Sequence, residues 1–415
     1  MPWPLAVNSI FFKERRFVVP VGLKHLEELS PIKGIQLASD AAGLKKSGAD
    51  DLVLITLNEG AEVAAAFTQN AFCAAPVIVA KDHLAKRTPR ALLINAGNAN
   101  AGTGARGEHS ARQSCQAVAR MLNLDETEVL PFSTGVIGEP LPVEKICQKI
   151  PDIVNQLDAD NWMEAAKGIM TTDTLPKGCS RQLTIDNKII TITGIIKGAG
   201  MICPNMATML AFIGTDACVE GAALQGLLKR VLAYSLNSLT VDGDTSTNDA
   251  CVVMASGQAA NRPLDASHPD WPHFVSAVQS LFIELGQAVI RDAEGATKFV
   301  TLQVEGGATE AECRKVAYTV AHSPLVKTAL FASDANWGRL LAAIGRSGLA
   351  HLDINLIDLY LGEVNLIKGG QPVDGYQDAD GQAEMAKDEI TVRIVLGRGG
   401  GGGPVGGGAV VFFFF

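Results

Sequence analysis

The segment KGAGMICPNMATMLAFIGTDA, residues 197–217, places the hydroxyl of Thr208 directly after the small Ala207. A hydroxyl can attack the carbonyl of the peptide bond that precedes it, and hydrolysis of the resulting ester leaves that residue with a free α-amine. Such an amine has a pKa of about 7.7–8.0, so it can act as the general base for its own hydroxyl. The segment predicts self-cleavage between Ala207 and Thr208. The alternative is a structural threonine whose hydroxyl binds a backbone carbonyl.

A second candidate pair, Thr134 and Gly135, lies in the motif FSTGVIGEP. The negative charge that develops on an attacked carbonyl needs hydrogen-bond donors aimed at it, and a threonine hydroxyl and a glycine N–H can supply two. The alternative is a plain turn between a strand and a helix, which glycine favours.

Other polar motifs do not form a ligand set. The glycine-rich run 95–107 lacks the spacing of nucleotide-binding loops. The run DGDTSTND, residues 242–249, lacks the ligand spacing and final Glu of a calcium loop, so we predict a hydrogen-bonded turn that supports the site. The seven histidines are scattered without ligand spacing. We expect no metal.

The elements that must position these residues alternate between helix and strand, which predicts a mixed α/β protein. Residues 182–196 carry an Asp-Asn turn typical of a hairpin. Apolar residues at three- and four-residue steps predict a helix over 107–124, with Ser110 as N-cap. Further strands are predicted at 51–58, 75–80, 91–97, 298–306 and 389–397, and further helices at 144–157, 161–170, 221–238 and 273–293.

Composition limits the class of protein. The chain has 415 residues, of which 47% are hydrophobic, but no apolar run reaches the roughly 18–20 residues of a membrane helix. The net charge of −9 and the absence of a basic block argue against a nucleic-acid partner. Eight dispersed cysteines without a C-x-x-C pair indicate a reducing compartment. The positive charges near the N-terminus follow the short apolar stretch, which is the wrong order for a secretory signal, so we predict a cytoplasmic protein.

Six motifs together resemble the ornithine acetyltransferase family, also called glutamate N-acetyltransferase, of arginine biosynthesis. The likeness begins near GIQLASDAAGLKKSG at residue 34 and continues in family order to about residue 397. Its motifs are INAGNANAGTG (94–104), STGVIGEPLP (133–142), the segment 197–217, TVDGDTSTND (240–249), RDAEGATK (291–298) and DANWGRLLAAIGRSG (334–348).

The resemblance implies a layered α-β-β-α sandwich and a self-cleaving precursor. Residues 1–207 would be the α chain and 208–396 the β chain, with the two staying together in an α2β2 heterotetramer. Acetyl would pass from N2-acetylornithine to glutamate by a ping-pong mechanism without cofactor or metal, with acetyl-CoA as a further co-substrate of some members. The implied roles are nucleophile for Thr208, oxyanion hole for Thr134 and Gly135, and substrate binding for Thr174, Lys197, Thr208 and Glu294. Lys197 suits a carboxylate and Glu294 an ammonium group.

The tail, residues 397–415, departs from the family. Nine glycines and four terminal phenylalanines predict a disordered or frameshifted segment. The family pattern implies an Asn and a Ser or Thr that close over the substrate, and no residue after Thr391 can replace them. Three hypotheses stay open: the acetyltransferase, with acetyl transfer impaired if the tail is real; a self-processing amidase or aminopeptidase with an N-terminal nucleophile; and an inactive scaffold whose tail binds a partner.

Overall fold

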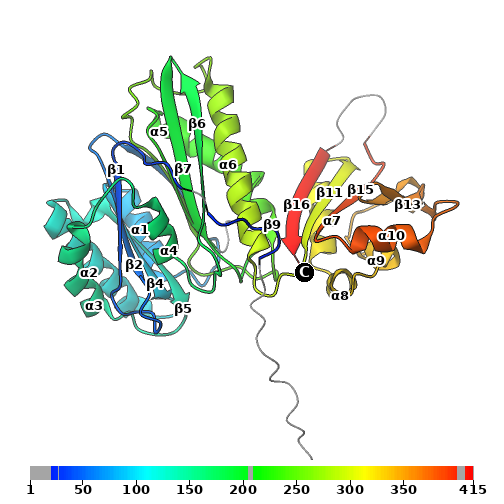
Figure 1. Ribbon diagram of the computed structural model, residues 1–415, viewed down its shortest axis with the longest axis horizontal. Helices are drawn as coiled ribbons and strands as arrows, with labels where there is room; N and C mark the ends of the chain where they lie inside the picture. The colour runs from blue at the N-terminus through cyan, green and yellow to red at the C-terminus, as the bar shows by residue number, and fades with distance from the viewer. Residues whose placement is uncertain (1–19, 27, 204–208, 400–406, 415) are drawn as a thin grey trace, which may run out of the picture.

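The computed structural model describes residues 20–26, 28–203, 209–399 and 407–414. Figure 1 shows two parts side by side: a larger part that contains β1–β10 and α1–α6, and a smaller part that contains β11–β16 and α7–α10. The short strand β9 (Leu239–Thr240) belongs to the larger part by sequence but pairs with the sheet of the smaller part. This pairing connects the two.

The first sheet of the larger part has four strands in the order β1-β2-β4-β5. Its first three strands pair antiparallel, and β4 and β5 pair parallel. A parallel pair needs a crossover connection, which is supplied here by a helix. The strands are β1 (Ile35–Asp40), β2 (Leu52–Leu57), β4 (Ala91–Asn98) and β5 (Val129–Val136).

The second sheet has five strands in the order β3-β10-β8-β7-β6. Every residue of β8 and β10 is buried, because both faces of this sheet are covered. The strands β6 and β7 form the predicted hairpin, and its turn residues Asp186 and Asn187 both have positive φ. The strands are β3 (Glu62–Phe67), β6 (Lys177–Ile185), β7 (Lys188–Lys197), β8 (Leu210–Thr215) and β10 (Ala250–Ala255).

The two sheets pack face to face between outer layers of helices. Phe132 of the first sheet meets Phe212 of the second edge-on, with ring centroids 5.2 Å apart. The helices α2 (Gly104–Leu122) and α3 (Val143–Val154) pack on the outer face of the first sheet. The helices α5 (Gly221–Ala233) and α6 (Trp271–Arg291) pack on the outer face of the second. The predicted α-β-β-α sandwich is therefore confirmed.

The smaller part is one mixed sheet covered by helices around its own core. The strand order is β14-β13-β12-β15-β11-β16-β9. The strands are β11 (Phe299–Gly307), β12 (Asp358–Leu361), β13 (Val364–Lys368), β14 (Gln371–Pro372), β15 (Glu389–Val395) and β16 (Gly407–Phe414), and the helices are α7 (Glu310–Ala321), α8 (Pro324–Phe331), α9 (Trp337–Gly345) and α10 (Asp378–Met385). The sequence patterns indicated two of these strands but no separate core.

The remaining short elements complete the larger part and one loop of the smaller part. They are α4 (Trp162–Gly168) and the 3-10 turns Glu126–Glu128, Leu236–Ser238 and Ile354–Leu356. Helix α6 is the one described helix long and apolar enough to cross a membrane, and half of its apolar window is buried inside the protein. Phe274 and Phe282 of that helix lie in the core against the second sheet, so its apolar character serves packing.

Two local predictions were wrong. Residues 75–80 are not a strand but the start of helix α1 (Ala75–Leu84), whose first turn contains Pro76, a residue suited to that position. A short buried helix and a buried strand have the same apolar pattern, so periodicity did not separate them. Ser110 is not the N-cap of α2, which begins six residues earlier at Gly104, and Ser110 lies buried inside that helix.

The prediction for the tail is corrected over residues 407–414, which form the strand β16. This strand pairs antiparallel with β11 and parallel with β9. Ala409, Val411 and Phe413 are buried, whereas Val410 is exposed, so the segment alternates with the period of a strand that has one face on a core. Glycine and phenylalanine content suggested disorder, but this alternation places three apolar side chains on a hydrophobic core.

Candidate active site

Lys197, the last residue of β7, stands at the centre of the candidate site. Its side chain is buried, and Nζ donates to Thr171 Oγ1 at 2.6 Å and to Thr134 Oγ1 at 3.3 Å. Because β7 belongs to the second sheet and Thr134 to β5 of the first, the site lies where the two sheets meet. The structure therefore brings together two residues that the sequence predicted for it.

Gly135 adopts a backbone conformation that a side chain does not tolerate. Its φ is +133°, and a Cβ atom built on it would lie 2.3 Å from the carbonyl carbon of Gly97, its neighbour in the paired strand. The missing side chain of Gly135 permits the close approach of β4 and β5 next to Thr134. The pair Thr134–Gly135 thus lies near the end of a strand rather than in a free turn. Its role as an oxyanion hole stays a prediction.

Charged neighbours partly offset the cost of burying Lys197. Burial lowers the pKa of its ammonium group, while the carboxylate of Asp173 raises it and the ammonium of Lys177 lowers it again. Asp249 and Glu294 also raise it. An ammonium that is desolvated, yet held by hydroxyl groups, can bind a carboxylate strongly.

Glu294 lies against residues 198–200, the glycine-rich stretch that precedes the predicted cleavage point in the chain. Its backbone N–H donates to the carbonyl of Ala199 at 2.8 Å. A Cβ atom on Gly200 would lie 3.0 Å from the carboxylate oxygen of Glu294, so the glycine permits this contact. Glu294 is exposed. Its role in binding a cationic group stays a prediction.

Thr174 is exposed, but its hydrogen-bonding groups face the protein. Its N–H donates to Asp292 Oδ2 at 2.9 Å, and its hydroxyl donates to Asp292 Oδ1. The hydroxyl oxygen keeps lone pairs for a ligand. Its substrate-binding role stays a prediction.

Ala207 and Thr208, the predicted cleavage pair, lie outside the described residues. The described chain resumes at Met209, which directly precedes β8. The first residue of β8, Leu210, is the pairing partner of Lys197. The strand that follows the predicted nucleophile therefore begins beside the buried lysine.

Side chains of the acidic motif 242–249 form hydrogen bonds with backbone groups of the neighbouring segments. Asp242 accepts the N–H groups of Met201 at 2.6 Å and Ile202 at 3.1 Å. The side-chain amide of Asn248 donates to the carbonyls of Ser133 at 2.9 Å and Ala99 at 2.6 Å. The glycine-rich run, the Thr-Gly motif and the acidic motif are thereby held together.

The sequence patterns did not indicate Thr171, Asp173 or Lys177 as site residues. Asp173 and Lys177 form an ion pair with an Nζ–Oδ1 distance of 2.6 Å, and both side chains are fully buried. The four-residue spacing of opposite charges in residues 171–177 was a possible signal, but the same spacing is common on exposed helices. Only burial distinguishes the two cases.

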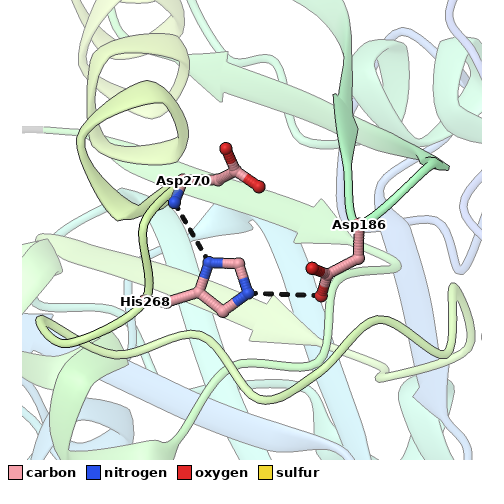
Figure 2. Close-up of side chains that lie close together, drawn as sticks. All are labelled: Asp186, His268 and Asp270. Carbon is pink, nitrogen blue, oxygen red and sulfur yellow. Dashed lines mark hydrogen bonds and ion pairs between the residues drawn. The ribbon is translucent and has the colours of Figure 1, made fainter.

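One group of side chains outside this site has the composition of a metal centre. Figure 2 shows that His268 Nε2 points at Asp186 Oδ2, at 3.2 Å, while Nδ1 accepts the backbone N–H of Asp270 at 3.1 Å. Arg262 also pairs with Asp186, at 2.6 Å. Both ring nitrogens and the Asp186 carboxylate are therefore engaged within the protein. The cluster fastens the β6–β7 turn to the loop before α6.

The fold and the convergence of hydroxyl, ammonium and carboxylate groups where its sheets meet define an enzyme of the layered α-β-β-α class. A family model described as the ArgJ family matches residues 36–407. The chain belongs to the ArgJ family.

Curated relatives match over nearly their whole length. The chain is 53% identical over 380 residues to the arginine biosynthesis bifunctional protein ArgJ of Pseudomonas syringae pv. tomato, which covers 91% of this chain and 94% of the relative. It is 52% identical over 371 residues to the protein of the same name from Methylococcus capsulatus, covering 89% and 91%.

A solved structure of arginine biosynthesis bifunctional protein ArgJ from Bacillus halodurans is 38% identical, covers 48% of this chain and 90% of that chain, and has a TM-score of 0.45. The structure of ornithine acetyltransferase complexed with ornithine, from Mycobacterium tuberculosis, is 34% identical, covers 43% and 95%, and has a TM-score of 0.37.

Proposed function

We propose that this protein transfers acetyl from N2-acetylornithine to glutamate through an acyl-enzyme on Thr208. Membership of the ArgJ family makes it an acyltransferase of arginine biosynthesis. The observation that carries the residue assignment is the contact between Lys197 and Thr134. Lys197 also pairs with Leu210 of β8, and Leu210 is two residues after Thr208 in the chain.

Self-cleavage is proposed to prepare the nucleophile. The Thr208 hydroxyl attacks the carbonyl carbon of Ala207, the C–N bond breaks, and water hydrolyses the ester. The new α-amine at Thr208 then takes the hydroxyl proton during acyl transfer.

The arrangement of the second sheet supports continued association of the two fragments. In the order β3-β10-β8-β7-β6, the strands β3, β7 and β6 precede the proposed cleavage point in the chain, and β8 and β10 follow it. Both fragments also share the core beneath α5 and α6. Separation would break two strand pairings and expose that core, so we propose that the fragments remain together. Assembly into α2β2 and a cytoplasmic location are parts of the same proposal.

The acyl transfer follows a ping-pong order. Thr208 attacks the acetyl carbonyl and ornithine leaves as the amine; glutamate then attacks the acetyl-threonine and leaves as N-acetylglutamate. Thr134 accepts a hydrogen bond from Lys197, so its own hydroxyl proton is free to donate to the developing oxyanion, together with the Gly135 N–H. The α-carboxylate of either substrate is assigned to Lys197, and the side-chain ammonium of ornithine to Glu294.

The direct test is product analysis with the purified, full-length protein. Incubation with N2-acetylornithine and glutamate should give N-acetylglutamate and ornithine in equal amounts, without an added cofactor. Release of acetate instead, at a rate independent of glutamate, would identify an amidase. Replacing acetylornithine with acetyl-CoA shows whether this second donor is used.

The nucleophile is tested by substitution. Thr208→Ala should abolish both the cleavage, seen by intact mass, and the transfer, whereas Thr208→Ser should retain part of each. A scaffold without catalytic function predicts that neither product formation nor mass depends on residue 208.

A further inference from the structure

Three fully buried charged groups form a bridge beneath the candidate site. Lys177, the first residue of β6, places Nζ 2.6 Å from Asp173 Oδ1 and 2.6 Å from Asp292 Oδ2. The exposed fraction is 0% for the side chains of Lys177 and Asp173 and 1% for that of Asp292. Asp292 is the C-cap of α6, so the bridge connects the start of a strand, the loop before it and the end of a helix.

Such a bridge is costly if it serves stability alone. Taking ions out of water carries a penalty of several kcal/mol each, and packed apolar residues often replace a buried ion pair without loss of stability. This group holds two carboxylates and one ammonium, so it retains one net negative charge. A role beyond packing is expected for it.

Asp173 connects the bridge to the carboxylate-binding side of the site. Its Oδ1 accepts the N–H of Gly198 at 2.7 Å, and its Oδ2 accepts the N–H of Thr171 at 3.0 Å. Thr171 Oγ1 in turn accepts from Lys197 Nζ. Asp173 therefore holds the backbone of two residues: Gly198, which follows Lys197, and Thr171, whose hydroxyl receives the Lys197 ammonium group.

Asp292 connects the bridge to the side of the candidate site that contains Thr174 and Glu294. It accepts both the N–H and the hydroxyl of Thr174. It also lies two residues before Glu294, whose own N–H is held by Ala199. The position of the exposed Glu294 carboxylate thus depends on the end of α6 that Lys177 holds.

We propose that Lys177 is a positioning residue for acetyl transfer: by bridging Asp173 and Asp292, it sets the separation between Lys197 and Glu294 and keeps the Lys197 ammonium on Thr171 and Thr134. This inference rests on the proposed function, which assigns the substrate carboxylate to Lys197 and the ornithine ammonium to Glu294. Without the Lys177 charge, Asp173 would be the nearest uncompensated anion, and Lys197 would turn toward it and away from Thr134.

The electrostatics around Lys197 agree with this role. Burial alone would raise the pKa of Asp173, but the ammonium groups of Lys177 and Lys197 hold it below its usual range. The charged groups that interact electrostatically with Lys197 are Asp173, Lys177, Asp249, Glu294 and Lys45. Removing Lys177 takes away a positive neighbour, so the pKa of Lys197 should rise.

The experiment compares Lys177→Met with the unsubstituted full-length enzyme, with rates normalised to the cleaved, folded fraction. We expect KM for both acetylornithine and glutamate to rise at least tenfold, and the alkaline pH at which KM increases to move upward. Lys298→Met is the matched control, because it removes another buried lysine whose Nζ donates to a backbone carbonyl at 3.0 Å. That control should leave both KM values within twofold.

If Lys177→Met does not fold, Asp292→Asn decides the question. An asparagine has one acceptor oxygen for the two donors of Thr174 and cannot pair with Lys177 as an anion, so KM for acetylornithine should rise more than tenfold. Folded variants with unchanged KM values and an unchanged pH profile would overturn the inference. If the unsubstituted enzyme makes no N-acetylglutamate, the proposed function itself fails, which is a separate outcome.

Discussion

The Nζ of Lys197 lies 3.3 Å from the Oγ1 of Thr134, and this contact joins the end of β7 in the second sheet to β5 in the first. The contact sets the direction of the Thr134 hydroxyl. Because Oγ1 accepts a hydrogen bond from the Lys197 ammonium group, the O–H bond of Thr134 must point away from that group. One lysine thereby binds a carboxylate and orients an oxyanion donor in the proposed reaction. Small displacements between the two sheets should therefore affect binding and catalysis together.

Substitution of Lys197 should weaken substrate binding. For Lys197→Met we expect kcat/KM for glutamate to fall about 10- to 100-fold, the loss of a hydrogen bond to a charged group. In the unsubstituted enzyme, KM should rise as pH increases through the pKa of Lys197, because only the protonated amine binds the carboxylate. Burial lowers that pKa below 10.5, so the rise should begin at a lower pH than for an ordinary lysine. Steady-state kinetics from neutral to alkaline pH measure both effects.

A surface lysine provides the comparison. Lys86, which follows the end of α1, is exposed and pairs with Asp82 of that helix, and Lys86→Met should change neither KM nor its pH dependence. A pH-independent KM for the unsubstituted enzyme would contradict the assignment of Lys197.

Gly135 should not tolerate a side chain. Gly135→Ala places a Cβ atom 2.3 Å from the Gly97 carbonyl carbon at a φ of +133°, so β4 and β5 must separate next to Thr134. We expect kcat to fall by about 10²- to 10³-fold, as for loss of one oxyanion donor. Gly226→Ala is the control, because a Cβ atom there meets no neighbour within 4 Å and the residue lies in α5. It should leave activity unchanged and raise helix stability by roughly 0.5–1 kcal/mol.

Asp173 should contribute stability that depends on pH. Its pKa is held below the usual range in the folded protein, so its contribution is complete above the unfolded pKa, about 3.9, and is lost as pH falls through the folded value. At neutral pH, Asp173→Asn should lower the free energy of unfolding by about 3–5 kcal/mol, because Lys177 and Lys197 lose a buried partner. Urea unfolding at neutral and acidic pH should show this difference shrinking below about pH 4. If the difference in unfolding free energy between the two proteins did not change with pH, the ionisation of Asp173 would not contribute to stability as predicted.

The strand β16 should be required for the smaller part of the fold. Phe413 is 1% exposed on the core, so Phe413→Ala should lower stability by about 3–5 kcal/mol. Val410 lies on the other face of the same strand and is 43% exposed, so Val410→Ala should cost less than about 0.5 kcal/mol. Chemical unfolding followed by tryptophan fluorescence measures both. Equal effects of the two substitutions would mean that the strand does not pack as observed.

Strongly periodic segments were predictable because their pattern reports which face is buried. The helices α3, α4 and α6 and the β6–β7 hairpin lie close to the residues expected for them. Helix α1 and strand β16 were not predictable, since a short apolar run does not distinguish helix from strand and a glycine-rich composition conceals an alternation of only three buried side chains.

The sequence by itself supplied the residue types of the candidate site: a threonine after a small residue, a Thr-Gly pair, and a lysine and a glutamate of opposite charge. The choice of partners for these groups was left to the tertiary structure. Lys197 contacts Thr134, which is 63 positions away, and Thr174 contacts Asp292, which is 118 positions away, because the two sheets and α6 end at one place. A buried charged group pairs with whichever group the packing places within a few ångströms of it. The distance between two such groups depends on how the layers pack against each other, and no local pattern of residues encodes that packing.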